Sequence, residues 1–177
     1  MLSKQVTGSN KGIGFGIIKE LCAKFDGDVY LTSRDVNRGT SAVEELNKLG
    51  FHPKFHQLDI DDSNSVTQLR DFLKSTYGGL DVLVNNAAIA FSNAATEPFG
   101  EQATVTLRTN FFNTHMTCKI LFPILKPHAR VVNVSSNLGH FSKLTGEKEA
   151  ALQLKNKLAS PDLTEEELCE LMQNFVT

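Results

Sequence analysis

The stretch VTGSNKGIG, residues 6–14, decides the fold class of this chain. Gly8, Gly12 and Gly14 are spaced as in a turn that joins a buried strand to a helix and lets bare backbone approach a phosphate. The free N–H groups and the positive dipole end at the start of the next helix favour an anion there. A tight strand-to-helix turn without a ligand explains the glycines as well. A P-loop is excluded, because no Gly-Lys-Ser/Thr follows.

The composition is that of one globular domain. The chain has 177 residues, of which 41% are hydrophobic and 21% charged. The net charge of −2 gives no reason to expect nucleic acid or an anionic membrane as a partner, and no apolar run approaches the roughly 20 residues that span a bilayer. Cys22, Cys118 and Cys169 are far apart and odd in number, which argues against disulfides or a zinc site. We expect a metal-free cytoplasmic protein.

Apolar runs and helical spacing alternate along the chain after the glycine turn. Strands are predicted at 29–32, 55–60, 81–85 and 130–134, and helices at 13–25, 38–49, 63–77 and 102–121. The strand before the turn is weak, because Lys4 and Gln5 stand where a central strand favours apolar residues. The alternation predicts an α/β, Rossmann-like, doubly wound parallel sheet of about five strands.

After Ser136 the chain becomes polar, and no further strand is predicted. A helix is expected at 147–158, and a capping box at Thr164 predicts another. We therefore divide the chain into a nucleotide-binding core, 1–136, and a helical, insertion-like segment of the same domain, 137–177.

Basic residues follow the second predicted strand. NAD-binding folds place an acid about 20 residues after the glycines, but this chain has Ser33 and Arg34 there, with Arg38 close behind. Guanidinium groups pair with phosphate, so Arg34, Arg38 and Lys11 favour the 2′-phosphate of NADP. A solvated helix residue is an equal explanation of Arg38, and Asp35 is expected to cap the helix.

Other candidates follow the later strands. Asp59 and Ile60 close the third strand, where a carboxylate can accept a hydrogen bond from adenine, although an N-cap role competes. Asn86 follows the fourth strand at the expected ligand crevice. Asn110 lies within a helix and either faces solvent or opens a water site by bonding backbone. Ser136 ends the fifth strand, where it either polarises a carbonyl or forms an ordinary turn.

Several stretches together resemble the short-chain dehydrogenase/reductase family, and within it the animal NADPH-dependent carbonyl reductases. They are GSNKGIG, FHQLDIDDSNSV, YGGLDVLVNNAAIAF, TNFF, RVVNVSS and TEEELCELM. The resemblance implies hydride transfer from NADPH to ketones, aldehydes or quinones in the cytosol. It implies that Ser136 polarises the substrate carbonyl and that Asn110 holds a relay water. The cofactor-binding residues are then Gly8, Asn10, Lys11, Gly12, Ile13, Gly14, Arg34, Arg38, Asp59, Ile60 and Asn86.

The sequence departs from the family at two functional points. Ala88 stands where the family usually carries glycine. The family's acid is a tyrosine with a lysine four residues later, but the chain's two tyrosines, Tyr30 and Tyr77, are followed at that spacing by Arg34 and Asp81. We therefore expect a C-terminally incomplete sheet, truncated before the Tyr-x-x-x-Lys motif, with little or no reductase activity.

Two hypotheses stay open. The chain is either part of a carbonyl reductase, or a non-enzymatic remnant that binds nucleotide or acts through interaction surfaces. The resemblance also implies that the segment after Ser136 keeps intact relatives monomeric. In this chain the fifth strand is expected to be an open edge that can associate with another chain.

Overall fold

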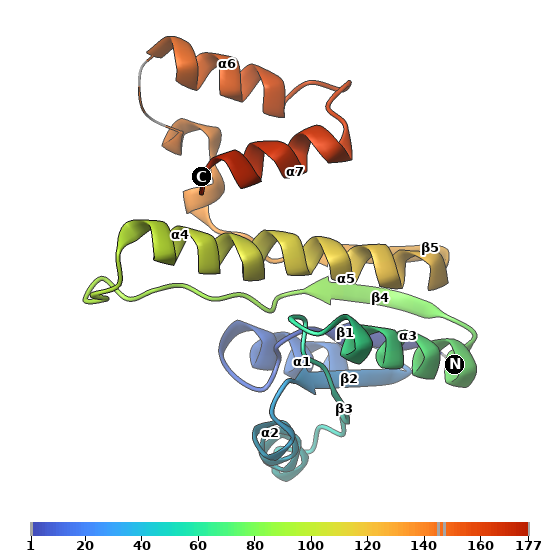
Figure 1. Cartoon of the computed structure of the whole chain (residues 1–177). Helices are drawn as coiled ribbons and strands as arrows, with labels where there is room; N and C mark the ends of the chain where they lie inside the picture. The colour runs from blue at the N-terminus through green and yellow to red at the C-terminus, as the bar shows by residue number, and fades with distance from the viewer. Residues whose placement is uncertain (1, 145, 147, 177) are drawn as a thin grey trace.

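The computed structural model describes residues 2–144, 146 and 148–176. Within them, one parallel sheet has the strand order β3-β2-β1-β4-β5. The expected doubly wound α/β fold is confirmed (Figure 1). The strands are β1 Ser3–Val6, β2 Asp28–Ser33, β3 Lys54–Gln57, β4 Leu80–Asn85 and β5 Leu125–Asn133. The helices are α1 Gly12–Lys24, α2 Val36–Lys48, α3 Ser63–Tyr77, α4 Phe99–Leu107, α5 Thr114–Leu121, α6 Lys148–Leu158 and α7 Glu165–Asn174.

Helices cover both faces of the sheet, and each face has its own apolar core. Leu69 of α3 and Leu121 of α5 pack with Leu83 on one face. Ile18 of α1 and Leu46 of α2 pack with the strands β1, β2 and β4 on the other. Parallel strands buried on both faces need such covering helices, since each crossover returns over the sheet.

The weak first strand lies at the centre of the sheet, paired with β2 and β4. Lys4 is 3% exposed, yet its ammonium donates to the carbonyl of Asp26 at 2.6 Å and lies 5.5 Å from the centroid of the Phe25 ring. Pairing with this carbonyl and this ring, rather than access to water, therefore compensates for the burial of Lys4. Gln5 is fully buried, and neither polar atom of its side chain has a hydrogen-bond partner among the described residues.

The helix expected at 102–121 is not one regular α-helix. It starts earlier, at Phe99, and a π-helical turn, Arg108–Asn113, separates α4 from α5. A π-helical turn is an insertion within an α-helix and is frequent at functional sites. It contains Asn110, the residue for which a water site was one of the two predictions.

Other boundaries differ from the predictions by a few residues. The third strand ends at Gln57 rather than Ile60, so Asp59 lies on a loop, whereas β5 begins earlier than expected, at Leu125. The described part of the second-last helix begins at Lys148; Glu147, its expected first residue, lies outside the described residues.

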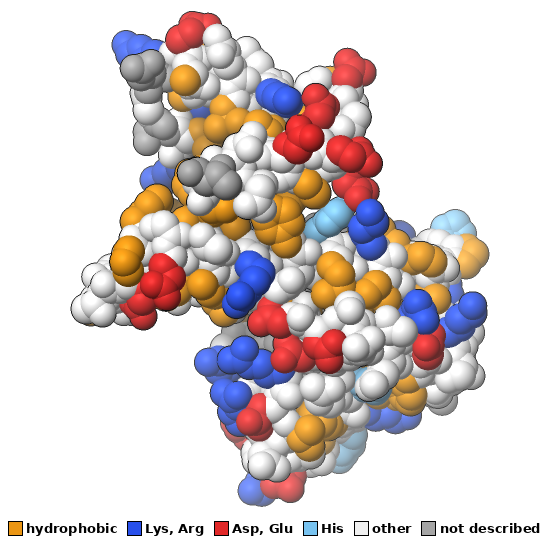
Figure 2. All heavy atoms as spheres, viewed as in Figure 1, with side chains coloured by type: hydrophobic (Ala, Val, Ile, Leu, Met, Phe, Trp, Pro, Cys, Tyr) orange, Lys and Arg blue, Asp and Glu red, His pale blue; other side chains and the backbone are white. Residues whose placement is uncertain are grey.

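The segment after β5 forms a helical pair over α4 and α5, on the side away from α2 (Figure 1). Phe175, which directly follows α7, meets Phe99 of α4 with ring centroids 6.3 Å apart. Glu165 accepts from Lys119 at 2.7 Å and lies 3.1 Å from His115 Nε2. Figure 2 shows hydrophobic side chains between this helical pair and α4, and acidic side chains gathered over α7.

Candidate functional site

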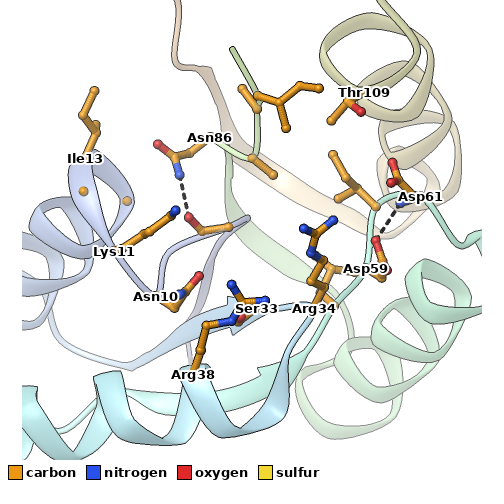
Figure 3. A pocket seen from close by; sticks show the side chains of 18 residues that line it. Asn10, Lys11, Ile13, Ser33, Arg34, Arg38, Asp59, Asp61, Asn86 and Thr109 are labelled. Atoms are coloured by element: carbon orange, nitrogen blue, oxygen red, sulfur yellow. Dashed lines mark hydrogen bonds between the residues drawn. The ribbon is translucent and has the colours of Figure 1, made fainter. Parts of the chain in front are cut away.

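A cavity of about 410 Å³ lies at the carboxyl ends of β1, β2 and β4 (Figure 3). Ligands bind at this edge in open α/β sheets, because loops and helix N-termini converge there. Every residue expected to bind a cofactor lines the cavity. The lining residues are Gly8, Asn10, Lys11, Gly12, Ile13, Gly14, Ser33, Arg34, Arg38, Leu58, Asp59, Ile60, Asp61, Asn86, Ala87, Ala88, Ile89 and Thr109.

The glycines of the turn have distinct structural reasons. Gly8 and Gly12 both have φ of +59°, a conformation that side chains disfavour. Gly14 has no room for a side chain, since a Cβ there would lie 2.5 Å from Asn86 Nδ2. Asn86 in turn donates from Nδ2 to the carbonyls of Thr7 at 2.9 Å and Gly8 at 3.0 Å. The end of β4 therefore holds the turn in place.

Thr7 makes the reciprocal connection. Its hydroxyl oxygen accepts from the backbone N–H groups of Asn86 and Ala87, both at 2.8 Å. The residue after Ala87, Ala88, has no positive φ, so replacing the family's glycine there introduces no backbone strain.

Three cationic side chains surround the cavity. Arg34 follows β2 and Arg38 lies in the first turn of α2, and both side chains are exposed, while Lys11 precedes α1 across the cavity (Figure 3). Asp35 caps α2, as expected, by accepting from the Arg38 N–H at 2.8 Å. Its other oxygen lies 3.6 Å from Arg38 Nε. Because this ion pair is exposed and loosely spaced, it leaves the guanidinium available to an anion.

The carboxylates after β3 divide their roles. Asp62 is the N-cap of α3 and accepts from the Asn64 N–H at 2.9 Å. The competing N-cap role for Asp59 is therefore not used. Asp59 instead accepts from the Asp61 N–H at 3.0 Å and lines the cavity.

The two residues expected to act on a substrate do not line this cavity. Asn110 binds Ile89 in both directions: its Nδ2 donates to the Ile89 carbonyl and its Oδ1 accepts from the Ile89 N–H, each at 2.9 Å. Asn110 thereby fixes a wall of the cavity from the π-helical turn. Ser136 is exposed, and its Oγ accepts from the Leu138 N–H at 3.2 Å.

Neither tyrosine is near the cavity. Their hydroxyls lie 2.7 Å apart, and Tyr77 donates to Asp28 at 2.5 Å, at the amino end of β2. Burial, then the hydrogen bonds with Asp28 and Tyr30, raise the pKa of the Tyr77 hydroxyl far above its usual value. Tyr77 is therefore a poor proton donor.

The comparisons with known proteins agree with this geometry. A family model described as short chain dehydrogenase matches residues 5–152. The chain belongs to the short-chain dehydrogenase family. It is 55% identical over 171 residues to "Carbonyl reductase [NADPH] 1" of Bos taurus. The matched residues make up 97% of this chain and 60% of that relative. The chain thus spans about 60% of the length of the curated relatives it matches.

Solved structures of this short-chain dehydrogenase fold superpose along nearly the whole chain. Salutaridine reductase from Papaver somniferum has a TM-score of 0.85 at 30% identity, covering 99% of this chain and 70% of its own. Menthone neomenthol reductase from Mentha piperita has a TM-score of 0.82 at 33% identity, covering 99% of this chain and 72% of its own.

The described residues bring no group of three His, Cys, Asp or Glu side chains together to suit a metal ion. A helix with the length and apolar character to cross a bilayer is also absent from residues 2–144, 146 and 148–176.

Some features of the site are not predicted from the sequence. Leu58 and Ile89 line the cavity, and Thr7 and Ser9 brace the turn without entering it. A signal was present in the hydroxyl side chains on either side of Gly8, because Ser and Thr readily bond nearby backbone.

Proposed function

We propose that this chain is the nucleotide-binding part of an NADPH-dependent carbonyl reductase. The reaction reduces ketones, aldehydes or quinones to alcohols or hydroquinones in the cytoplasm. The observation that carries the proposal is the convergence of Lys11, Arg34 and Arg38 on one cavity beside a glycine-rich turn. The bovine relative, whose name states NADPH and carbonyl reduction, supports the same function.

NADP(H) fits the residues present. The pyrophosphate lies against the turn, where Gly8 and Gly12 have positive φ and Gly14 admits no Cβ atom. Arg34 and Arg38 would hold the 2′-phosphate, because guanidinium groups pair with phosphate. Arg34 stands where NAD-binding folds carry the acid that binds a free 2′-hydroxyl. Asp59 accepts from the adenine amino group, and Ile60 contacts the base.

The nicotinamide side of the site depends on Asn86, Asn110 and Ser136. When bound, NADPH supplies the hydride. Asn86 orients the nicotinamide ribose, and the Ser136 hydroxyl polarises the substrate carbonyl. The Asn110 amide already donates to and accepts from the main chain of Ile89. Main-chain atoms of the π-helical turn, rather than this side chain, therefore hold the relay water.

A second function rests on the two tyrosines. Tyr30 and Tyr77 are bonded to each other and to Asp28 away from the cavity, so neither protonates a developing alkoxide. By themselves, residues 1–177 therefore hold the nucleotide without turnover. In this case the chain acts as a binding protein, and the exposed Val131 and Val132 of the edge strand β5 offer a surface for association.

We propose that the segment 137–177 belongs to the same domain as the core 1–136 and that the corresponding segment keeps intact relatives monomeric, as the resemblance implies. It covers α4 and α5 through Phe175 and Glu165.

Calorimetric titration of the purified chain tests the main proposal. We expect NADP⁺ to bind at least about tenfold more tightly than NAD⁺, because a charged hydrogen bond contributes about 1.5–3 kcal/mol. Failure to bind either nucleotide contradicts the proposal.

A further inference from the structure

Between Gly8 and Gly14, Ser9 is the one residue that does not line the cavity. Gly8 and the residues from Asn10 to Gly14 line the cavity, whereas Ser9 does not and is fully buried. A buried hydroxyl at a ligand-binding turn requires partners, because an unpaired one costs about 1–3 kcal/mol.

The partners of Ser9 lie on β2. Its backbone N–H donates to the Thr32 carbonyl at 2.8 Å, and its Oγ lies 2.9 Å from the Thr32 N–H, which donates to it. The same Oγ donates to the carbonyl of Val6 at 2.8 Å, and Thr32 Oγ1 donates to that carbonyl at 2.8 Å. The paired register of β1 and β2 ends at Val6 and Leu31. Ser9 thus extends the connection between the strands after β1 has turned away.

This connection joins two parts of the cavity. Ser33 and Arg34 follow Thr32 directly and line the cavity on the β2 side. Gly8 and Asn10 flank Ser9 and line it on the turn side. The proposed function assigns the 2′-phosphate to the first part and the pyrophosphate to the second. In NADP one ribose carries both groups, which limits their separation to a narrow range. Binding both at full strength therefore requires a matching separation between the two parts of the cavity.

We propose that Ser9 is a positioning residue that sets the distance between the two phosphate-binding parts of the site. The inference rests on the proposed function, since it concerns the preference for NADP over NAD. Ser9 touches neither phosphate. Its hydroxyl acts through Thr32 on the placement of Arg34. Loss of the hydroxyl therefore weakens the binding of NADP, which uses both parts, more than the binding of NAD, which uses the turn alone.

A purely structural role makes a different prediction, and Ser3 provides the matched control. Ser3 is also fully buried, at the other end of β1, and its Oγ donates to the Gly79 carbonyl at 3.0 Å. Ser3→Ala therefore removes a comparable buried hydroxyl far from the cavity.

The experiment measures the ratio of the dissociation constants for NAD⁺ and NADP⁺ by calorimetry in the full 177-residue chain. Folding of each variant is checked by circular dichroism. We expect Ser9→Ala to lower this ratio about tenfold and Ser3→Ala to leave it within about twofold of the unchanged chain. Ser9→Cys keeps a weak donor and acceptor and gives an intermediate ratio.

A ratio for Ser9→Ala within about twofold of the unchanged chain overturns the role of Ser9, as does an equal loss in Ser3→Ala. If Ser9→Ala does not fold, the ratio for Ser9→Cys decides: an unchanged ratio overturns the inference and a reduced one supports it. If the unchanged chain binds NAD⁺ and NADP⁺ equally, the proposed function fails, and the inference fails with it. Failure of Ser9 alone leaves the NADP preference of the unchanged chain intact.

Discussion

A Cβ atom on Gly14 would lie 2.5 Å from Nδ2 of Asn86, so these two residues set how closely α1 approaches the end of β4. The same position is only 2.8 Å from the Ser9 Cα and 2.9 Å from the Gly8 carbonyl oxygen. Because two of these three atoms belong to the backbone, a side-chain movement of Asn86 cannot relieve the contact.

Gly14→Ala is therefore expected to destabilise the chain by about 1–3 kcal/mol and to weaken nucleotide binding. Gly16 is the matched control, because it lies in the same helix and a Cβ there meets no atom within 4 Å. Gly16→Ala is expected to stabilise the chain by about 0.5–1 kcal/mol. Urea unfolding monitored by circular dichroism measures both. Equal effects of the two substitutions contradict this packing argument.

The polar side chain of Gln5 is expected to lower the free energy of unfolding. It lies on the central strand opposite Tyr30 and Leu83, fully buried, with both polar atoms unpaired among the described residues. Gln5→Met keeps the shape and removes the unpaired groups, so we expect the free energy of unfolding to rise by about 1–3 kcal/mol. The exposed control Gln68→Met should change it by less than about 0.5 kcal/mol. A decrease on Gln5→Met in urea unfolding refutes the prediction.

Acid sensitivity is expected from Asp81. Partial burial raises the pKa of its carboxyl, but the Ser3 N–H at 2.8 Å and the Lys126 ammonium at 2.9 Å lower the pKa more, so it lies below the usual value. The unfolded chain then binds the proton first as the pH falls. The contribution of Asp81 is complete above the unfolded pKa of about 3.9 and is lost as the pH falls through the lower, folded pKa.

Asp81→Asn should therefore unfold with less dependence on pH below about pH 4, although it is less stable at neutral pH. The exposed control Asp162→Asn should keep the acid dependence of the unchanged chain. Midpoints of urea unfolding at a series of pH values measure this, and parallel curves for the unchanged chain and Asp81→Asn speak against it.

Catalysis by residues 1–177 alone is expected to be very weak. Tyr30 and Tyr77 are engaged away from the cavity, and loss of general-acid catalysis lowers rates by about 10²–10⁴-fold. NADPH oxidation with the quinone menadione, followed by absorbance, measures the activity, with the bovine carbonyl reductase as a parallel control. Turnover comparable to the control shows that an essential acid is not missing from these residues.

Local chemistry made much of the structure predictable from the sequence. The glycine spacing predicted the turn, and the apolar periodicity predicted α3, whose bounds, Ser63–Tyr77, are confirmed. The cofactor candidates line one cavity because each follows a parallel strand or opens a helix at the same edge of the sheet. Whether they hold NADP(H) stays a prediction.

Features that depend on distant contacts were not predictable. The hydroxyl of Thr7 meets backbone N–H groups 79 and 80 residues away, and Ser9 meets Thr32 across 23 residues. The π-helical turn arises inside a sequence with ordinary helical spacing, and Asn110 bonds Ile89 there across 21 residues. Lys4 fits a central strand because the chain brings the Asp26 carbonyl within reach, which no local pattern indicates.

The most direct test of the account is the nucleotide preference of Arg34→Asp, measured by calorimetry against the unchanged chain. An acid at this position favours a free 2′-hydroxyl and repels a 2′-phosphate, so the preference for NADP⁺ over NAD⁺ should vanish or reverse. Arg70, a partly exposed residue on α3 paired with Asp71, provides the control Arg70→Asp, which should keep the preference. If Arg34→Asp binds NADP⁺ as selectively as the unchanged chain, the assignment of the cavity to a 2′-phosphorylated dinucleotide is wrong.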